Sequence, residues 1–194
     1  LREASGEMIL VTALPLYHIF SLTANCLLFM KLGAHNVLIA NPRDFQGFVK
    51  ELSKVRFTFF SGVNTLFNAL LNTPGFDQVD FSALKVSLGG GMAVQRAVAE
   101  RWKQVTGNTL TQAWGLTETS PAACINRFDA PEFTGSIGLP ISSTVITIRD
   151  DDGNELPVRA SGEICVEGPQ VMRGYWNRAD ETEKVMIDGR ILRT

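Results

Sequence analysis

Short apolar runs alternate with amphipathic segments through the first two-thirds of this 194-residue chain, and this alternation restricts the fold more than any other feature. Residues 8–14 form an apolar run typical of a strand buried on both faces. Residues 21–31 then have helical spacing as far as Gly33. Further strands are expected at 36–39, 56–60, 84–88 and 109–114, with helices at 44–54, 64–71 and 94–105. The pattern predicts an α/β fold with a mostly parallel sheet flanked by helices on both faces.

The pattern changes after about Pro140, where alternating apolar and polar residues replace the buried runs. Residues 145–149 and 162–168 have the period of two that is typical of half-buried strands. Asp150–Gly153 reads as a solvated turn between them, and a short helix is expected near 180–185. This part of the chain therefore predicts a small antiparallel β-segment, part of a barrel.

Composition excludes several classes of protein. A net charge of -2, a pI of about 5.7 and scattered basic residues leave no footprint for nucleic acid or anionic lipid. Cys26, Cys124 and Cys165 are too far apart for a zinc site and too few for a disulfide framework, which favours a reducing, cytoplasmic compartment. The longest apolar stretch, residues 19–32, falls short of the roughly 20 apolar residues that a membrane span needs.

The segment Gln112–Thr119 places four chemically useful residues where a buried strand ends: Trp114, Gly115, Thr117 and Glu118. Ligands of open α/β sheets gather at the carboxyl ends of the strands. A hydroxyl beside a carboxylate suits a phosphate with its Mg²⁺ ion, and an indole offers a flat face to a purine. A capped turn with a buried tryptophan explains the same residues, so the segment alone leaves both interpretations open.

Three glycines, Gly89, Gly90 and Gly91, follow the strand expected at 84–88 and precede a helix. Bare backbone permits the close approach of a flat or anionic ligand, and a helix N-terminus favours negative charge. The segment is neither a Gly-x-Gly-x-x-Gly element nor a Walker loop, so an ordinary strand-to-helix turn remains an alternative.

His18 follows the first expected strand and has aromatic neighbours at Tyr17 and Phe20. A histidine at the end of a buried strand can face a ligand at the sheet edge. A packed structural histidine is the alternative interpretation.

In their order and spacing these segments resemble the adenylate-forming ligases, which include acyl-CoA synthetases. The similarity runs through essentially the whole chain and rests on Tyr17-His18, Gly89-Gly90-Gly91, Trp114-Gly-Leu-Thr-Glu118, Gly135–Pro140 and Gly162-Glu-Ile to Gly174-Tyr-Trp176. Residues 41–44, 62–71 and 150–155 are similar to bacterial long-chain fatty acid–CoA ligases in particular. The resemblance implies that residues 1–140 form the α/β subdomain of an AMP-binding domain and 141–194 part of its small β-rich subdomain.

The resemblance also implies an activity in two steps. The carboxylate of a long-chain fatty acid attacks the α-phosphate of Mg²⁺-bound ATP, giving acyl-adenylate and pyrophosphate. The thiol of coenzyme A then displaces AMP to form the thioester. Such chemistry requires neutralised phosphate charge and the exclusion of water from a reactive anhydride.

Roles at the nucleotide end are implied by the same motifs. Glu118 would bind Mg²⁺, and Thr117 would contact a phosphate oxygen. Trp114 takes the place of the family's adenine-stacking aromatic residue, usually a tyrosine, so stacking is retained but contacts of the tyrosine hydroxyl are not carried over. Gly115 belongs to the same nucleotide-binding set.

At the acyl end, Gly89–Gly91 would lie between adenine and the acyl chain, with Gly90 in contact with the chain. His18 would stand beside the carboxylate and the α-phosphate, where we expect it to position them and not to transfer protons. Gly62 and Val63 would line an apolar tunnel that receives the chain at about 0.8 kcal/mol per buried CH₂.

Alternatives remain for the function. The chain also fits another acyl- or aryl-CoA ligase of the superfamily, or a non-catalytic domain that retains the fold. An NAD-binding domain is disfavoured, because no strand leads into Gly-x-Gly-x-x-Gly with an acidic residue about 20 positions later. The resemblance leaves open a homodimer and a peripheral association of the longer protein with the inner face of the membrane.

Parts of the family pattern fall outside these 194 residues: a Ser/Thr/Gly-rich phosphate loop with its lysine, a ribose-binding Gly-Asp expected directly after Thr194, and a C-terminal domain with a second lysine. Residues 188–194 also depart from the usual Asp-Gly-Trp-Leu-x-Thr. We therefore expect the isolated chain to form no acyl-CoA. A radiolabelled acyl-transfer assay tests this, and turnover by the 194-residue chain would contradict it.

Overall fold

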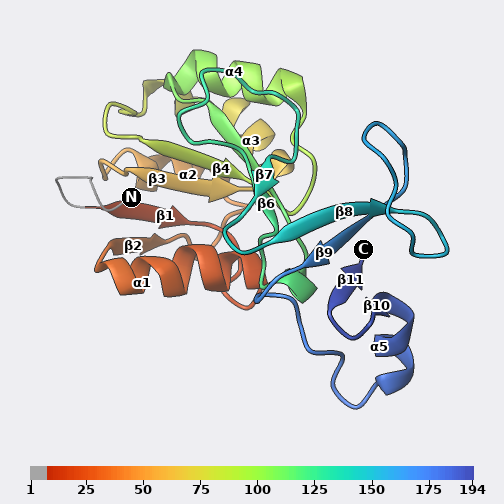
Figure 1. Ribbon diagram of the computed structural model, residues 1–194. Helices are drawn as coiled ribbons and strands as arrows, with labels where there is room; N and C mark the ends of the chain where they lie inside the picture. Colours follow the sequence, from red (N-terminus) through yellow and green to blue (C-terminus); the bar gives the residue numbers. More distant parts are fainter. Residues whose placement is uncertain (1–7) are drawn as a thin grey trace.

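The computed structural model describes residues 8–194, and its larger sheet has seven strands in the order β2-β1-β3-β4-β5-β6-β7 (Figure 1). Strands β1 to β5 are parallel, and the last two pair antiparallel. The bounds are β1 (Ile9–Thr12), β2 (His35–Leu38), β3 (Phe59–Gly62), β4 (Val86–Gly89), β5 (Leu110–Trp114), β6 (Cys124–Ile125) and β7 (Leu139–Pro140). The predicted α/β fold with a mostly parallel sheet is confirmed.

Helices cover both faces of this sheet, with α1 on one side and α4 on the other in Figure 1. Their bounds are η1, a π-helix (Ser21–Leu27), α1 (Leu28–Leu32), α2 (Phe45–Leu52), α3 (Asn64–Leu71) and α4 (Arg96–Thr106), with short 3₁₀ turns η2 (Phe76–Gln78) and η3 (Thr117–Thr119). Apolar side chains of α2, α3 and α4 share one buried cluster, and Phe20 and Phe29 belong to another with side chains of β1, β3 and β4. No helix of the described part is long and apolar enough to cross a membrane.

Two strands end later than the sequence pattern predicts. β3 and β4 run on to Gly62 and Gly89, which pair with each other in register. Apolar patterning could not show this, because glycine carries no side chain to bury while its backbone still pairs. The edge of the sheet therefore lies at the glycines, directly beside the segment expected to bind a ligand.

The helix expected at 21–31 begins as a π-helix, which regular helical spacing did not predict. The amide of Leu28 donates to the carbonyl oxygen of Thr23, five residues earlier. Asn25 is fully buried, and its amide donates to Thr12 Oγ1 at 3.0 Å and to Ser61 Oγ at 2.8 Å. Since a buried amide needs such partners, this polar contact ties the helix to the ends of β1 and β3.

An aromatic cluster forms the centre of the larger core. The indole of Trp102 on α4 stacks on Phe60 with ring centroids 5.7 Å apart and meets the edge of Phe67 at 4.8 Å. Its Nε1 donates to Ser87 Oγ at 2.9 Å, and both residues are buried. The core thus combines apolar contact with one satisfied polar pair across α4 and β4.

The second sheet has four antiparallel strands in the order β10-β11-β9-β8. Their bounds are β8 (Val145–Arg149), β9 (Glu163–Glu167), β10 (Met186–Ile187) and β11 (Ile191–Arg193), and α5 (Ala179–Val185) precedes β10. Asp150 accepts the amide of Asn154 at 2.7 Å in the predicted turn. The predicted antiparallel segment is confirmed, whereas the division into subdomains 1–140 and 141–194 stays a prediction.

Replacement of Ser87 by alanine tests the polar pair of the core. Ser87→Ala leaves the buried indole N–H of Trp102 without its acceptor, which should lower the free energy of unfolding by about 1–3 kcal/mol. Urea denaturation measures the change. The control is Ser142→Ala on an exposed loop, expected to change stability by about 0.5 kcal/mol or less. Equal stability of the two variants would contradict the assignment.

Candidate functional site

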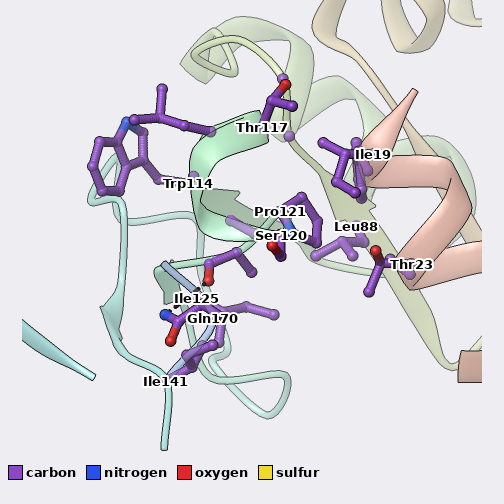
Figure 2. Close-up of a pocket in the computed structure, with 18 of the residues that line it drawn as sticks. Ile19, Thr23, Leu88, Trp114, Thr117, Ser120, Pro121, Ile125, Ile141 and Gln170 are labelled. Carbon is purple, nitrogen blue, oxygen red and sulfur yellow. Dashed lines mark hydrogen bonds between the residues drawn. The ribbon is translucent and has the colours of Figure 1, made fainter. Parts of the chain in front are cut away.

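A cavity of about 540 Å³ opens where β4 and β5 end against the helical segment that starts at Ile19. Figure 2 shows Ile19 and Thr23 on the helix at one side of it, with Ile125 and Ile141 across from them. Apolar side chains form most of the wall, including Ile19, Phe20, Leu28, Phe59, Leu88, Ala113, Ile125, Phe128 and Ile141. A cavity of this size and character suits a small apolar ligand or part of a longer one.

Most of the site residues expected from the sequence line this one cavity: His18, Gly90, Gly91, Trp114, Gly115, Thr117 and Glu118. They come from three chain segments that parallel topology carries to the same sheet edge. Thr117 is exposed and Glu118 is half-buried, so both side chains are accessible to a ligand. His18, Thr117 and Glu118 therefore add polar groups to a mostly apolar cavity, whose lining also includes Thr23, Ser120 and Gln170.

Three expected site residues lie outside the lining. A Cβ on Gly62 would meet Phe67 and Leu66 of α3, and one on Gly89 would meet Val94, so both glycines face the packed interior. Val63 lies behind the glycine wall, its Cγ1 being 3.4 Å from where Gly91 would carry a Cβ. The structure does not bring these three residues to the cavity, and their expected roles stay predictions.

Hydrogen bonds of the next residue, Thr119, stabilise the turn that carries Thr117 and Glu118. Thr119 is fully buried, and its Oγ1 accepts the amide of Leu116 at 2.8 Å and donates to the carbonyl of Pro121 at 2.9 Å. Gly115 lies so close to the Pro121 carbonyl that any Cβ there would collide with backbone. A small residue at 115 and a hydroxyl at 119 are thus needed to aim the two functional side chains.

Gly90 forms the floor of the apolar part of the cavity. A Cβ at this position would stand 3.1 Å from Cε1 of Phe20. Because Phe20 is itself buried and lines the cavity, a side chain at 90 would have to displace the ring or occupy ligand space. The absence of a side chain keeps the cavity open.

His18 lies at the rim with one ring nitrogen engaged and the other available. Its Nδ1 accepts the backbone amide of Phe20 at 3.2 Å. In a neutral ring this places the proton on Nε2, which can donate to an anionic oxygen. This contact orients the ring, which suits a positioning role.

Trp114 joins the cavity to the small sheet. It lines the cavity, pairs through its backbone with Cys124 of β6, and packs against a buried cluster of Ala123, Val166 and Leu192. The indole is half-buried, so part of its surface is available to a ligand. Trp114 thus packs in a core, as the alternative interpretation requires, and also borders the cavity, while its expected contact with adenine stays a prediction.

Glu118 carries the negative charge of the site. Its Oε1 accepts the phenol of Tyr175 at 2.7 Å, and its backbone carbonyl accepts the amide of Met172 at 2.8 Å. The hydrogen bond to the carboxylate, together with partial burial, raises the pKa of the Tyr175 phenol. In the described part of the chain no cationic side chain forms an ion pair with Glu118.

The donor set fits Mg²⁺ only as an ion that arrives with phosphate. Residues 8–194 contain no cluster of three or more side chains that could hold a metal by themselves. Mg²⁺ commonly takes one or two carboxylates and completes its shell with water and substrate phosphates. Glu118, charged and without a cationic partner, can supply such a carboxylate beside the exposed hydroxyl of Thr117.

The sequence analysis did not single out Phe20, Thr119 or Tyr175 as parts of the site. The position of Phe20 near His18 could have indicated a place in the site, and so could the position of Thr119 directly after Glu118. Tyr175 had no such signal, because its contact with Glu118 spans 57 residues and depends on how the second sheet is placed. The Gly174-Tyr-Trp176 motif contributes only to the family resemblance, which assigns no role to the tyrosine.

The family model for "AMP-binding enzyme" matches residues 2–176, which is most of the chain. The chain belongs to the family of AMP-binding enzymes. The cavity with its glycine wall and Thr-Glu turn lies wholly within the matched range. The resemblance found in the motifs is confirmed at the level of the family.

Curated relatives carry a more specific description. A long-chain-fatty-acid–CoA ligase of Escherichia coli O6:H1 (strain CFT073) is 56% identical over 184 residues, which cover 95% of this chain and 33% of that protein. A protein of the same description from Haemophilus influenzae (strain Rd) is 52% identical, with 92% and 32% covered. The chain spans about a third of the length of the curated relatives it matches.

Solved structures share the fold. A long-chain-fatty-acid-CoA ligase from Archaeoglobus fulgidus superposes with a TM-score of 0.80 at 26% identity, covering 96% of this chain and 40% of that one. A benzoate CoA ligase from Burkholderia xenovorans LB400 gives 0.87 at 25% identity, with 97% and 38% covered. Structures described as CoA ligases for two different acids therefore share the fold of this chain.

The contact between Tyr175 and Glu118 predicts a change in titration. The sequence has two tyrosines, so Tyr17→Phe leaves Tyr175 as the one reporter of phenolate absorbance. The raised pKa means that the hydrogen bond stabilises the fold below the ordinary tyrosine pKa and is lost as pH rises through the raised value. In this background Glu118→Gln should move the pKa of Tyr175 back toward its ordinary value, because the carboxylate charge is gone.

Ultraviolet absorbance against pH measures this shift. The control is Glu132→Gln, at an exposed position outside the cavity lining, which should leave the titration of Tyr175 unchanged. Superimposable titrations of the Glu118 variant and its parent would show that the two side chains do not interact in solution.

Proposed function

We propose that the gene product carrying these residues is an ATP-dependent long-chain fatty acid–CoA ligase. The proposal rests above all on one observation, a mostly apolar cavity whose lining also includes His18, Thr117 and Glu118. Such a cavity suits a ligand with a long apolar tail and a reactive carboxylate. The relatives described as long-chain-fatty-acid–CoA ligases support the choice of substrate class.

In the first step the carboxylate oxygen attacks the α-phosphorus of ATP, and the bond from that phosphorus to the bridging oxygen breaks, releasing pyrophosphate. His18 would donate from Nε2 to the carboxylate or the α-phosphate, since its Nδ1 already accepts the amide of Phe20. Thr117 would donate to a phosphate oxygen. Donors that stand ready where negative charge builds up lower the barrier without reorganisation.

Glu118 would hold the Mg²⁺ ion that accompanies ATP. When bound, the ion would neutralise phosphate charge during the release of pyrophosphate. Trp114 and Gly91 would flank the adenine, and the acyl chain would lie along Phe20, Gly90 and Leu88. The apolar wall would exclude water from the anhydride.

In the second step the sulfur of coenzyme A attacks the acyl carbon, and the bond from that carbon to the oxygen of AMP breaks. The thiol proton leaves to solvent, AMP departs and the thioester remains. We assign ATP, a long-chain fatty acid and coenzyme A as substrates, and a cytoplasmic location.

A panel of acids tests the substrate class. In the whole gene product, kcat/KM for pyrophosphate release should rise from butyrate to palmitate, by up to about fourfold per CH₂ that enters the cavity, since each is worth about 0.8 kcal/mol. Gly90→Val should reduce the value for palmitate far more than that for butyrate, because the new side chain meets Phe20 and narrows the apolar part.

The panel also separates the alternatives. Preference for benzoate over palmitate would indicate an aryl-CoA ligase and contradict the proposal. A folded gene product without pyrophosphate release for any acid would indicate a non-catalytic domain that retains the fold.

A further inference from the structure

Tyr175 reaches the functional turn from the far end of the chain. Its phenol donates to Glu118 Oε1 at 2.7 Å, although the two residues lie 57 positions apart. Tyr175 comes from the loop between β9 and α5, whereas Glu118 comes from η3 at the end of β5. The loop of the small sheet thereby contacts the carboxylate that faces the cavity.

The place of Tyr175 is fixed by contacts that do not involve the Glu118 carboxylate. The backbone amide of Tyr175 donates to Thr182 Oγ1 at 2.9 Å, and that hydroxyl donates to the Arg178 carbonyl at 2.9 Å. The amide of Met172 donates to the carbonyl of Glu118 at 2.8 Å, which holds the loop and the turn in register. The phenol is thus presented to the carboxylate by the backbone of its own loop and by α5.

The chemistry of this contact differs from that of an ion pair. A neutral phenol occupies one acceptor position on Oε1 and leaves the negative charge and the second oxygen in place. An arginine or lysine in the same position would neutralise the carboxylate and compete with a cation. Across residues 8–194 the ion pairs that do form lie elsewhere, for example Arg193 with Glu163 at 2.7 Å. A metal-binding carboxylate benefits from a hydrogen-bond donor that orients it and does not neutralise its charge.

We propose that Tyr175 is a positioning residue that holds the Glu118 carboxylate in the orientation from which it receives the cation of a metal–nucleotide. The inference rests on the proposed function, because it assumes that Glu118 faces Mg²⁺-bound ATP. It adds a residue from the small sheet's loop to a site otherwise formed at the edge of the large sheet. It also makes the placement of that loop a determinant of metal affinity.

Equilibrium binding tests the role directly. Isothermal titration calorimetry on the whole gene product measures the Kd of ATP with Mg²⁺ present and with Mg²⁺ removed by chelation. Tyr175→Phe should weaken binding of the Mg²⁺ complex by about tenfold, the lower end of the usual effect of losing an outer-shell partner. It should leave the Kd of metal-free ATP unchanged, because the phenol acts only through the carboxylate.

Trp176→Phe is the matched control. Trp176 is the next residue of the same loop and 90% exposed, so its replacement perturbs the loop sequence without removing the hydrogen bond. Both Kd values should stay at those of the unmodified protein. An equal loss of affinity in the two variants, or an equal loss with and without Mg²⁺, would show a structural role for the loop and overturn the inference.

A double-mutant cycle separates positioning from packing. If Tyr175 acts through Glu118, then Tyr175→Phe should cost nothing further in the background of Glu118→Gln. Additive losses would overturn the inference. The two proposals fail in different ways: no tighter binding of ATP with Mg²⁺ in the unmodified protein would contradict the proposed function, whereas a metal effect that Tyr175→Phe leaves intact would contradict only the role of Tyr175.

Discussion

The rest of the site depends on the hydrogen bonds of one buried hydroxyl group, that of Thr119. It accepts the Leu116 amide and donates to the Pro121 carbonyl, closing the turn that presents Thr117 and Glu118. Gly115 packs against the Pro121 carbonyl so closely that a side chain at position 115 would collide with the backbone of the turn. Thus a residue that contacts no ligand sets the direction of the two residues proposed to do so, and the nucleotide end can be rigid before anything binds.

Buried hydrogen bonds also fix the opposite wall of the cavity. The amide of Asn25, buried in η1, bonds to Thr12 and Ser61 at the ends of β1 and β3, which ties the π-helix to the sheet. Residues of the same helical segment, Ile19 to Leu28, provide one side of the apolar space (Figure 2). π-Helical turns are rare and often occur at functional sites, because they redirect side chains that a regular helix would place elsewhere. Buried polar contacts therefore lie below both walls of a cavity whose surface is mostly apolar.

Sequence reasoning predicted the features that depend on local pattern. The parallel strands, the helices on both faces and the meeting of Gly90, Gly91, Thr117 and Glu118 at one edge follow from periodicity and from the geometry of parallel sheets. It did not predict the π-helix, because a π-helical segment of seven residues offers too few apolar positions to distinguish its period from that of an α-helix. The expected role of Gly62 beside the acyl chain stays a prediction, and the structure shows that this glycine faces α3. The contact of Tyr175 could not be predicted, because it requires the relative placement of two sheets.

In the proposed function, one cavity holds the tail of a fatty acid along Gly90 and its activated carboxyl group beside Thr117. The most direct test is a crystal structure of the whole gene product with a non-hydrolysable acyl-sulfamoyl adenosine. We expect the acyl chain between Phe20 and Leu88, the sulfamate within hydrogen-bonding distance of Thr117 and the adenine against Trp114. An adenylate analogue bound outside this cavity, or with its acyl chain in solvent, would show that the cavity is not the adenylate site.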